Sequence, residues 1–231
     1  MENTAKLNTV NTAGLFPQWA IVTVLLAASL SILSAHSMYF YPLLLLIGFA
    51  TGIGQWWLLR QRMERIWSWI LASTLGWVGG FLLTAGIVYV IGYINLLVDF
   101  GVYMLYTLQI IVYPVALGIM AAAQGIILHR RGYNSRTWVL MGVAAGFALS
   151  LAQIGTCAAG GGAMFTQLIG SDAMTDAICV NIGVTIPRLQ TAEPFFNVAP
   201  LSFAAHVMGW LAYALVSAYG INRLLTEPRE A

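Results

Sequence analysis

Charged residues are scarce in this chain, and their scarcity excludes an ordinary soluble domain. Only 8% of its 231 residues are Asp, Glu, Lys or Arg, whereas 60% are hydrophobic. A soluble domain carries about 25% charged residues. So few charges cannot cover a surface that faces water, and the composition therefore indicates a protein that lies in a membrane.

The charges that do occur are unevenly spread and leave five long uncharged runs. With histidine counted as neutral, these runs cover residues 7–59, 66–98, 100–128, 137–171 and 194–222. Each run exceeds the ~20 residues that cross a bilayer as an α-helix. The alternation of apolar and polar residues that marks membrane β-strands is absent. The sequence therefore predicts an all-α protein, a polytopic transmembrane helical bundle of about six spans.

We expect a single transmembrane domain over residues 1–231. Its predicted parts are a cytoplasmic arm at 1–16, a first hairpin at 43–93, a second hairpin at 105–154, an outer loop segment at 155–200 and a last span at 201–222. The first span would run from Pro17 to about Ala35, because proline suits a helix start. A cleaved signal peptide is the alternative, but the long and nearly neutral stretch before Pro17 favours a retained span.

The basic residues predict the orientation of the bundle. With six spans, one face holds nine of the ten Lys and Arg residues, and only Arg188 falls on the other face. Cytoplasmic loops carry the excess of Lys and Arg in membrane proteins. We therefore expect a multi-pass protein of a bacterial cytoplasmic membrane with both termini in the cytoplasm.

The two cysteines, Cys157 and Cys179, both fall in the predicted outer segment. That compartment permits disulfides, and two cysteines allow only one intramolecular pairing. The alternative is a pair of unrelated buried thiols. Metal binding is not expected, because two cysteines with no histidine between them make an incomplete site.

The two predicted hairpins match each other at an offset of 69 residues without a gap. The matched pairs are Gln55 with Gln124, Leu59 with Leu128, Arg62 with Arg131, Trp69 with Trp138 and Leu71 with Leu140. Arg turns and interfacial tryptophans are common to any two cytoplasmic hairpins, but glutamines at one depth are not. The pattern predicts an internal parallel repeat of two helical hairpins, related by an axis along the membrane normal.

The matched glutamines are the best candidates for an interhelical polar contact. A Gln amide that faces lipid leaves donors and acceptors unsatisfied, so Gln55 and Gln124 should point inward. Small neighbours at Gly52, Gly54 and 121–123 would let the second and fourth spans approach closely there. The alternative is that each Gln reaches to the nearby interface. The tryptophans near the basic turns are interpreted as an interfacial belt, namely Trp56, Trp57, Trp67, Trp69 and Trp138.

These hairpin residues carry a resemblance to a family. The first hairpin reads G-x-x-Q-W-x-x-L-R and then W-x-x-x-S-x-x-G-W, with its fixed positions at Gly52, Gln55, Trp56, Leu59, Arg60, Trp69, Ser73, Gly76 and Trp77. It resembles uncharacterised bacterial multi-span membrane proteins in which such a hairpin recurs, often twice. The second hairpin departs from the pattern at Gly125, His129 and Gly142. The resemblance covers the hairpins, about half the chain, and implies a fold type without catalytic residues.

Ionisable residues within the spans are the usual mark of pumps and carriers, and this sequence predicts none. Asp172 and Asp176 are four residues apart in the outer segment and are interpreted as part of a short interfacial helix. Two histidines, His36 and His206, fall near the outer ends of the first and last spans. They could ligate haem or chlorophyll, but single interfacial histidines bonded to backbone or lipid are the simpler interpretation.

The sequence therefore favours a non-enzymatic integral membrane protein without a cofactor. We expect a scaffold or accessory subunit that packs against another membrane protein or binds an apolar ligand. The alternative is a small transporter of a neutral solute with its site between the two hairpin repeats, and a membrane enzyme comes third. The expected partners are the lipid bilayer and another membrane protein, and not nucleic acid.

Overall fold

The computed structural model describes residues 14–35, 40–63, 66–98, 103–164 and 195–226. These ranges contain α-helices and turns, and no strand. The helices are α1 (Leu15–Ala35), α2 (Phe40–Leu59), α3 (Ser68–Val98), α4 (Tyr103–His129), α5 (Ser135–Met164) and α7 (Phe195–Thr226). The all-α prediction is therefore confirmed for the described residues.

The helices have the length and composition of membrane spans. Five of them, all except α2, are long and apolar enough to cross a bilayer. Helix α2 has 20 residues, and its described apolar stretch, Leu45–Leu59, is shorter than the other candidate spans. Helices of this kind place the protein in a membrane, because a polypeptide backbone in lipid must satisfy its hydrogen bonds within each span.

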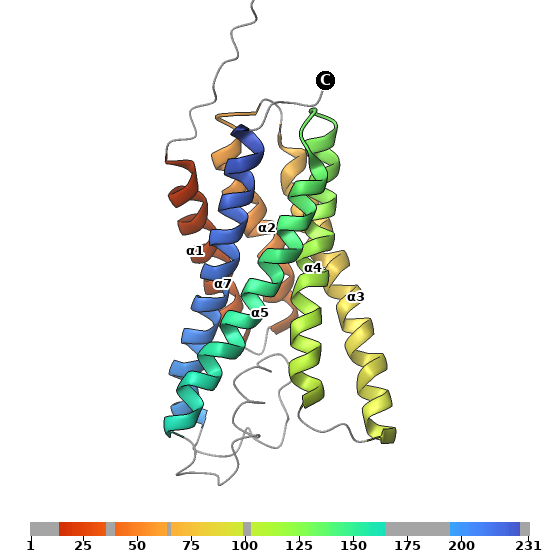
Figure 1. Ribbon diagram of the computed structural model, residues 1–231, viewed down its shortest axis with the longest axis vertical. Coiled ribbons are helices and arrows are strands. Elements are labelled where there is room, and N and C mark those ends of the chain that lie inside the picture. Colours follow the sequence, from red (N-terminus) through yellow and green to blue (C-terminus); the bar gives the residue numbers. More distant parts are fainter. Residues whose placement is uncertain (1–13, 36–39, 64–65, 99–102, 165–194, 227–231) are drawn as a thin grey trace, which may run out of the picture.

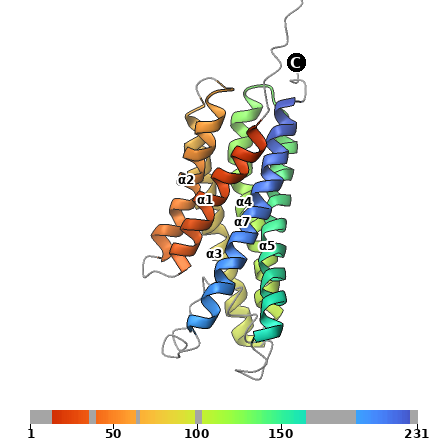
Figure 2. The same cartoon turned by 90° about the vertical axis from the view of Figure 1, so that its left-hand side faces the viewer.

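The six described helices form a closed ring, which we call the helix ring. Each helix packs against its neighbours in chain order, and α7 packs against α1 to close the circle. Figures 1 and 2 show this arrangement from two sides, with the beginning of α1 and the end of α7 at the same end of the bundle. Chain segments from the two ends of the sequence are therefore direct neighbours.

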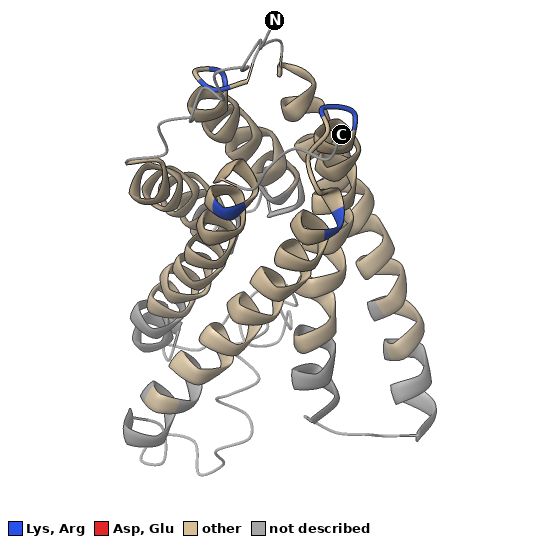
Figure 3. Cartoon of the chain, turned by 45° about the horizontal axis from the view of Figure 1, so that its top comes forward, with Lys and Arg blue, Asp and Glu red and all other residues tan. Residues whose placement is uncertain are grey.

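All charged side chains in the described ranges gather toward one end of the ring. They are Arg60, Arg62, Arg130, Arg131, Arg136 and Arg223, and no Asp or Glu occurs in these ranges. Figure 3 shows them in the two connecting turns and in the helix ends next to them. We call this the basic end and the opposite one the far end.

Glycines permit the close contacts between neighbouring helices. A methyl group on Gly80 of α3 would come within 2.6 Å of the Ala116 carbonyl oxygen of α4. On Gly146 of α5 it would lie 2.5 Å from the Pro114 Cα of α4. Real side chains do not approach so closely, so these helix pairs can pack as they do only with glycine at both positions. Small residues serve this purpose in many membrane helices.

The turn between α4 and α5 shows how local sequence ends one span and begins the next. Gly132 has a φ of 76°, which a residue with a side chain rarely adopts, and its N–H donates to the His129 carbonyl at 2.9 Å. Asn134 then accepts the Thr137 backbone N–H at 3.2 Å through Oδ1. Asn at this position is a common helix N-cap, so α5 begins at Ser135.

The helices at the far end are longer than the sequence suggests. Helix α5 continues to Met164 and α7 begins at Phe195, so both enter the predicted outer loop segment. The three glycines at 160–162 are helical. The segment 165–194 between these helices, with Asp172, Asp176 and Cys179, lies outside the described residues.

Candidate functional site

Gln55 and Gln124 meet in the interior of the helix ring. Both side chains are buried, and Gln124 Nε2 donates to Gln55 Oε1 at 3.4 Å. Their helices, α2 and α4, are separated in the ring by α3. The contact therefore spans the inner face of α3, and α2 does not pack along α4 as the small neighbouring residues suggested.

Those small residues instead serve contacts between adjacent helices. A methyl group on Gly52 would lie 2.8 Å from the Ser73 Cβ on α3, and Gly54 faces Val22 and Leu26 on α1. Ala121 lies opposite Gly142 on α5. Small residues near the glutamines thus indicate close helix packing correctly, but each one contacts the next helix of the ring.

Each glutamine accepts a hydrogen bond from an indole on the following helix. Trp69 Nε1 donates to Gln55 Oε1 at 3.1 Å, and Trp138 Nε1 donates to Gln124 Oε1 at 3.1 Å. The donor lies 14 residues after its acceptor in both hairpins. The same bond thus recurs at the sequence offset of 69 residues that separates Gln55 from Gln124.

Two further polar side chains complete the cluster that we call the polar centre, which consists of Gln55, Trp69, Ser73, Gln124, Trp138 and Tyr213. Ser73 Oγ accepts from Gln124 Nε2 at 2.8 Å and donates to the Trp69 carbonyl at 2.8 Å. The Tyr213 side chain is hydrogen-bonded to the Gln55 side chain. The polar centre therefore joins α2, α3, α4, α5 and α7 through uncharged groups.

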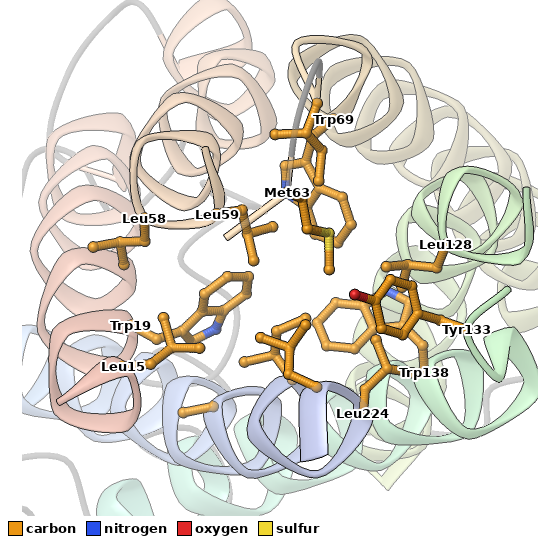
Figure 4. Close-up of a cluster of buried hydrophobic side chains, with 14 of the residues drawn as sticks. Leu15, Trp19, Leu58, Leu59, Met63, Trp69, Leu128, Tyr133, Trp138 and Leu224 are labelled. Atoms are coloured by element: carbon orange, nitrogen blue, oxygen red, sulfur yellow. The ribbon is translucent and has the colours of Figure 1, made fainter. Parts of the chain in front are cut away.

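A third indole lies beside this cluster and makes an equivalent bond. Trp19 Nε1 on α1 donates to Ser217 Oγ on α7 at 3.1 Å. The ring centroid of Trp19 is 6.4 Å from that of Trp69 and 6.2 Å from that of Trp138, and those two lie 5.7 Å apart. Figure 4 shows this Trp triad, formed by Trp19, Trp69 and Trp138, reaching inward from three different parts of the ring.

The burial of the triad corrects one sequence prediction. Trp69 and Trp138 were expected in an interfacial belt, but their exposed fractions are 0% and 2%. Trp57 and Trp67 do face outward, and the Arg60 guanidinium lies 3.4 Å from the Trp57 ring centroid. The interior tryptophans have acceptors that bind their N–H groups, so they do not need an aqueous interface.

A second polar layer lies toward the far end of the ring. Ser31 Oγ of α1 lies 2.8 Å from His206 Nδ1 of α7, and Tyr113 of α4 is hydrogen-bonded to Gln153 of α5. His206, a candidate haem or chlorophyll ligand, is thus buried against a serine. The other candidate, His36, lies outside the described residues, so the alternative of haem or chlorophyll ligation is not tested.

The chemistry of the polar centre is that of neutral hydrogen bonding. Its amides, indoles and hydroxyls supply donors and acceptors, and its one titratable side chain is the phenol of Tyr213. In the described ranges no three His, Cys, Asp or Glu side chains gather as a metal site would require. The arrangement therefore holds helices together or recognises neutral groups, and it lacks the acid and base pair of a hydrolase.

The proposed disulfide is outside what the structure describes. Cys157 falls in α5, but its side chain is not among the described ones, and Cys179 lies in the segment 165–194. Their pairing remains a prediction from sequence.

Sequence reasoning did not identify Trp19, Ser217, Ser73 or Tyr213 as parts of an interior site. One signal was present: Ala214, Ser217 and Ile221 repeat the spacing of Gly52, Gln55 and Leu59, with serine in place of glutamine. A search for identical residues overlooks this match, because no residue is the same in the two segments. What they share is a small residue, then a polar one, then a large apolar one.

Comparisons of the chain with protein families, with curated proteins and with solved structures give no match. The functional argument therefore rests on the residues and their geometry.

Proposed function

We propose that this chain is a non-enzymatic integral membrane protein of a bacterial cytoplasmic membrane, and that it acts as a scaffold or accessory subunit for another membrane protein. Its basic end would face the cytoplasm, in agreement with the usual excess of Arg and Lys on that side. The partner would dock on the outward face of α3.

The observation that carries this proposal is the placement of the helical glycines. A side chain added at most of them would collide with a neighbouring helix: Gly48, Gly52, Gly54, Gly76, Gly80, Gly118, Gly142, Gly146, Gly209 and Gly220. By contrast, a methyl group at Gly79, Gly86 or Gly155 would meet no described atom within 4 Å. Gly79 and Gly86 lie seven residues apart on α3, about two helical turns.

An open glycine pair gains little from contact with lipid, whereas it lets another helix approach closely. The surrounding surface supports the same interpretation. Only 24% of the membrane-crossing window of α3 is buried in the bundle, compared with 33% to 56% for the other four candidate spans. Exposed large side chains adjoin the glycines on α3, including Leu82, Leu83 and Tyr89. Helix α3 is therefore the best supported docking element of the chain.

Site-specific crosslinking tests this proposal. A photoreactive benzoylphenylalanine replaces Tyr89 on α3, and the matched control replaces Phe147, an exposed aromatic residue on α5. We expect the first variant to crosslink a defined protein that also co-purifies with the parent chain in mild detergent. Gly86→Leu should lower that co-purification several-fold without unfolding the chain.

Two results would contradict the scaffold proposal. One is that the positions at 89 and 147 crosslink the same abundant membrane proteins to equal extents. The other is that no protein co-purifies in mild detergent and Gly86→Leu changes nothing, because α3 would then face lipid alone.

We further propose that the two hairpins, α2–α3 and α4–α5, are copies of one ancestral unit. The equal indole-to-glutamine bonds support this, since both join residues 14 apart at matching positions. The bond from Trp19 to Ser217 supports a third and more diverged unit, made of α7 followed in space by α1. In this unit no turn of the chain would join the two helices, because α7 is the last described helix and α1 is the first.

A second candidate function is transport of a neutral solute along the axis of the helix ring. Buried polar side chains come from all six described helices and include no Asp, Glu, Lys or Arg; they are Thr23, Ser31, Thr51, Gln55, Ser73, Thr84, Gln124, Ser150, Gln153, His206 and Ser217. Light scattering from proteoliposomes exposed to urea, glycerol and larger polyols would detect such transport. Uptake unchanged by Gln55→Leu would exclude the polar centre as part of the path.

A further inference from the structure

Trp210 Nε1 and Thr23 Oγ1 are buried polar atoms without a hydrogen-bond partner in the described part of the chain. Their residues have exposed fractions of 2% and 0%. A buried donor that lacks a partner costs roughly 1–3 kcal/mol, so native structures rarely leave one unsatisfied. These two atoms therefore indicate a binding function that the polar centre does not explain.

Trp210 reaches across the interior of the ring. Its ring centroid lies 6.1 Å from that of Trp77, on α3, although α7 and α3 are not neighbours in the ring. It also packs edge-on against Tyr213 at 5.4 Å. Because Trp210 precedes Ser217 by seven residues, it lies about 10 Å farther from the basic end than the bond from Trp19 to Ser217.

Thr23 lies on the inward face of α1. It is four residues after Trp19 and four before Ala27, and all three are fully buried. By helical rise, Thr23 is about 6 Å below Trp19, so it differs in depth from Trp210 by only about 4 Å. Most other buried hydroxyls bond to a carbonyl of their own helix, as Thr51 does to Ile47 at 2.6 Å. The Thr23 hydroxyl makes no such bond.

We propose that the ring interior directly below the Trp triad binds a small neutral molecule with an apolar body and one hydrogen-bond acceptor oxygen, such as a carbonyl. An indole N–H can only donate, so the atom facing Trp210 must be an acceptor, and the Thr23 hydroxyl can donate to it as well. Trp77, Trp210 and Tyr213 supply apolar surface for the rest of the molecule. A charged ligand would meet no Asp, Glu, Lys or Arg among the described interior side chains.

This site is independent of the docking face on α3, so failure of either proposal leaves the other standing. If the chain transports a neutral solute, this site would be a binding position on the path along the ring axis. The site adjoins the polar centre through Tyr213, but its donors are different: the amides of the polar centre bond to one another and to the indoles, whereas Trp210 and Thr23 take no part in those bonds.

The experiment measures thermal stability of the purified protein in mild detergent with a series of ketones, from 2-butanone to 2-decanone. Alkanes of equal chain length, added at the same mole fraction in the micelle, are the control probes. We expect one size class of ketone to raise the Tm by roughly 3 °C more than its matched alkane, the shift expected of one added hydrogen bond. Thr23→Val and Trp210→Phe should each reduce that excess.

Thr84→Val is the control substitution, because the Thr84 hydroxyl is buried but bonded to the Phe81 carbonyl at 2.9 Å. It should leave the ketone excess unchanged. Resonance Raman difference spectra between the parent and Trp210→Phe should show the indole N–H becoming hydrogen-bonded when the ketone is added. Equal Tm shifts for ketones and alkanes across the series would overturn the proposal. An indole N–H already bonded without ketone and unchanged by it would also overturn it, since water would then be the occupant.

Discussion

Gln124 donates from Nε2 to the Oε1 atom of Gln55 at 3.4 Å, although the two residues are 69 positions apart in the chain. The bond links α2 to α4 across the inner face of α3. Each glutamine also accepts an indole N–H, from Trp69 or from Trp138. The two amides thus fix the relative positions of four helices at the basic end of the ring.

The glutamines should contribute to stability in a coupled manner. We expect Gln55→Leu or Gln124→Leu to lower the free energy of unfolding by about 1–3 kcal/mol, because each leaves a buried indole N–H without its acceptor. The double variant should lose less than the sum of the two, by about 0.6 kcal/mol, the mean of one interhelical hydrogen bond. Denaturant unfolding in detergent measures all three variants, with Gln18→Leu on the exposed part of α1 as the control. If the double variant lost as much stability as the two single variants together, the direct bond between Gln55 and Gln124 would be contradicted.

Tryptophans near the basic turns should differ sharply in their contribution to the stability of the fold. Trp69→Phe removes a buried N–H donor and part of a ring that packs in the Trp triad, so we expect a loss of roughly 1–3 kcal/mol. Trp57→Phe changes an exposed ring under Arg60 and should alter stability by less than about 0.5 kcal/mol. Thermal unfolding of both variants checks this. Equal effects would show that the triad adds nothing beyond burial of aromatic surface.

Two adjacent glycines on α3 offer a matched test of the ring packing. Gly80→Ala would place its methyl group 2.6 Å from the Ala116 carbonyl oxygen, so α3 and α4 must separate. We expect a destabilisation of roughly 1–3 kcal/mol, typical of overpacking. Gly79→Ala meets no described atom within 4 Å and should change stability of the isolated chain by less than about 0.5 kcal/mol. If Gly79→Ala were the more harmful change, the assignment of these two faces would be wrong.

The fold was largely predictable because the bilayer limits the possibilities. Uncharged runs longer than a span must be helices, and each Arg-rich turn marks the point where the two helices of a hairpin are joined. What sequence could not decide is the direction in which each tryptophan points. Trp67 is 61% exposed and Trp69 is fully buried, although both adjoin the same basic turn. Trp67 lies in the turn just before α3 and Trp69 in the first turn of that helix, so a composition argument cannot distinguish them.

The polar centre was predictable only in part, for a related reason. Gln55 and Gln124 stand out because an amide in lipid requires a partner. Ser217 does not stand out, because a serine can bond to its own helix, as its hydroxyl does to the Ala214 carbonyl at 3.2 Å. Its role as acceptor for Trp19 depends on the closure of the ring between α7 and α1. That contact joins residues 198 positions apart, and its one signal in the sequence is the spacing that Ala214, Ser217 and Ile221 share with the first hairpin.

The cysteines give a prediction that rests on sequence alone. We expect Cys157 and Cys179 to be oxidised to each other, because both fall in the segment assigned to the oxidising side of the membrane. Maleimide labelling of intact cells should therefore be weak before treatment with a reductant and strong afterwards. Strong labelling without reductant would exclude the disulfide. Labelling that requires cell lysis would reverse the proposed orientation.

The three-unit interpretation of the ring predicts that the chain can be opened at a different hairpin. The native chain is already open between α7 and α1, whose ends lie together at the basic end of the bundle (Figure 1). The turn between Leu59 and Ser68 occupies the equivalent place between α2 and α3. A circular permutant that joins the native termini by a Gly-Ser linker and opens this turn keeps the six described helices and leaves both new termini at the basic end.

We expect this permutant to insert, to elute from size-exclusion chromatography as a single species and to lie within roughly 1–2 kcal/mol of the parent in stability. The contacts from Trp19 to Ser217 and from Trp69 to Gln55 do not depend on which turn is closed, so both should survive. The parent chain with the same linker as a tail is the control. Gln55→Leu should destabilise the permutant as much as the parent. A permutant that folds but is insensitive to Gln55→Leu would mean that α2 and α3 pair only when their turn is intact, and the three units would then not be equivalent.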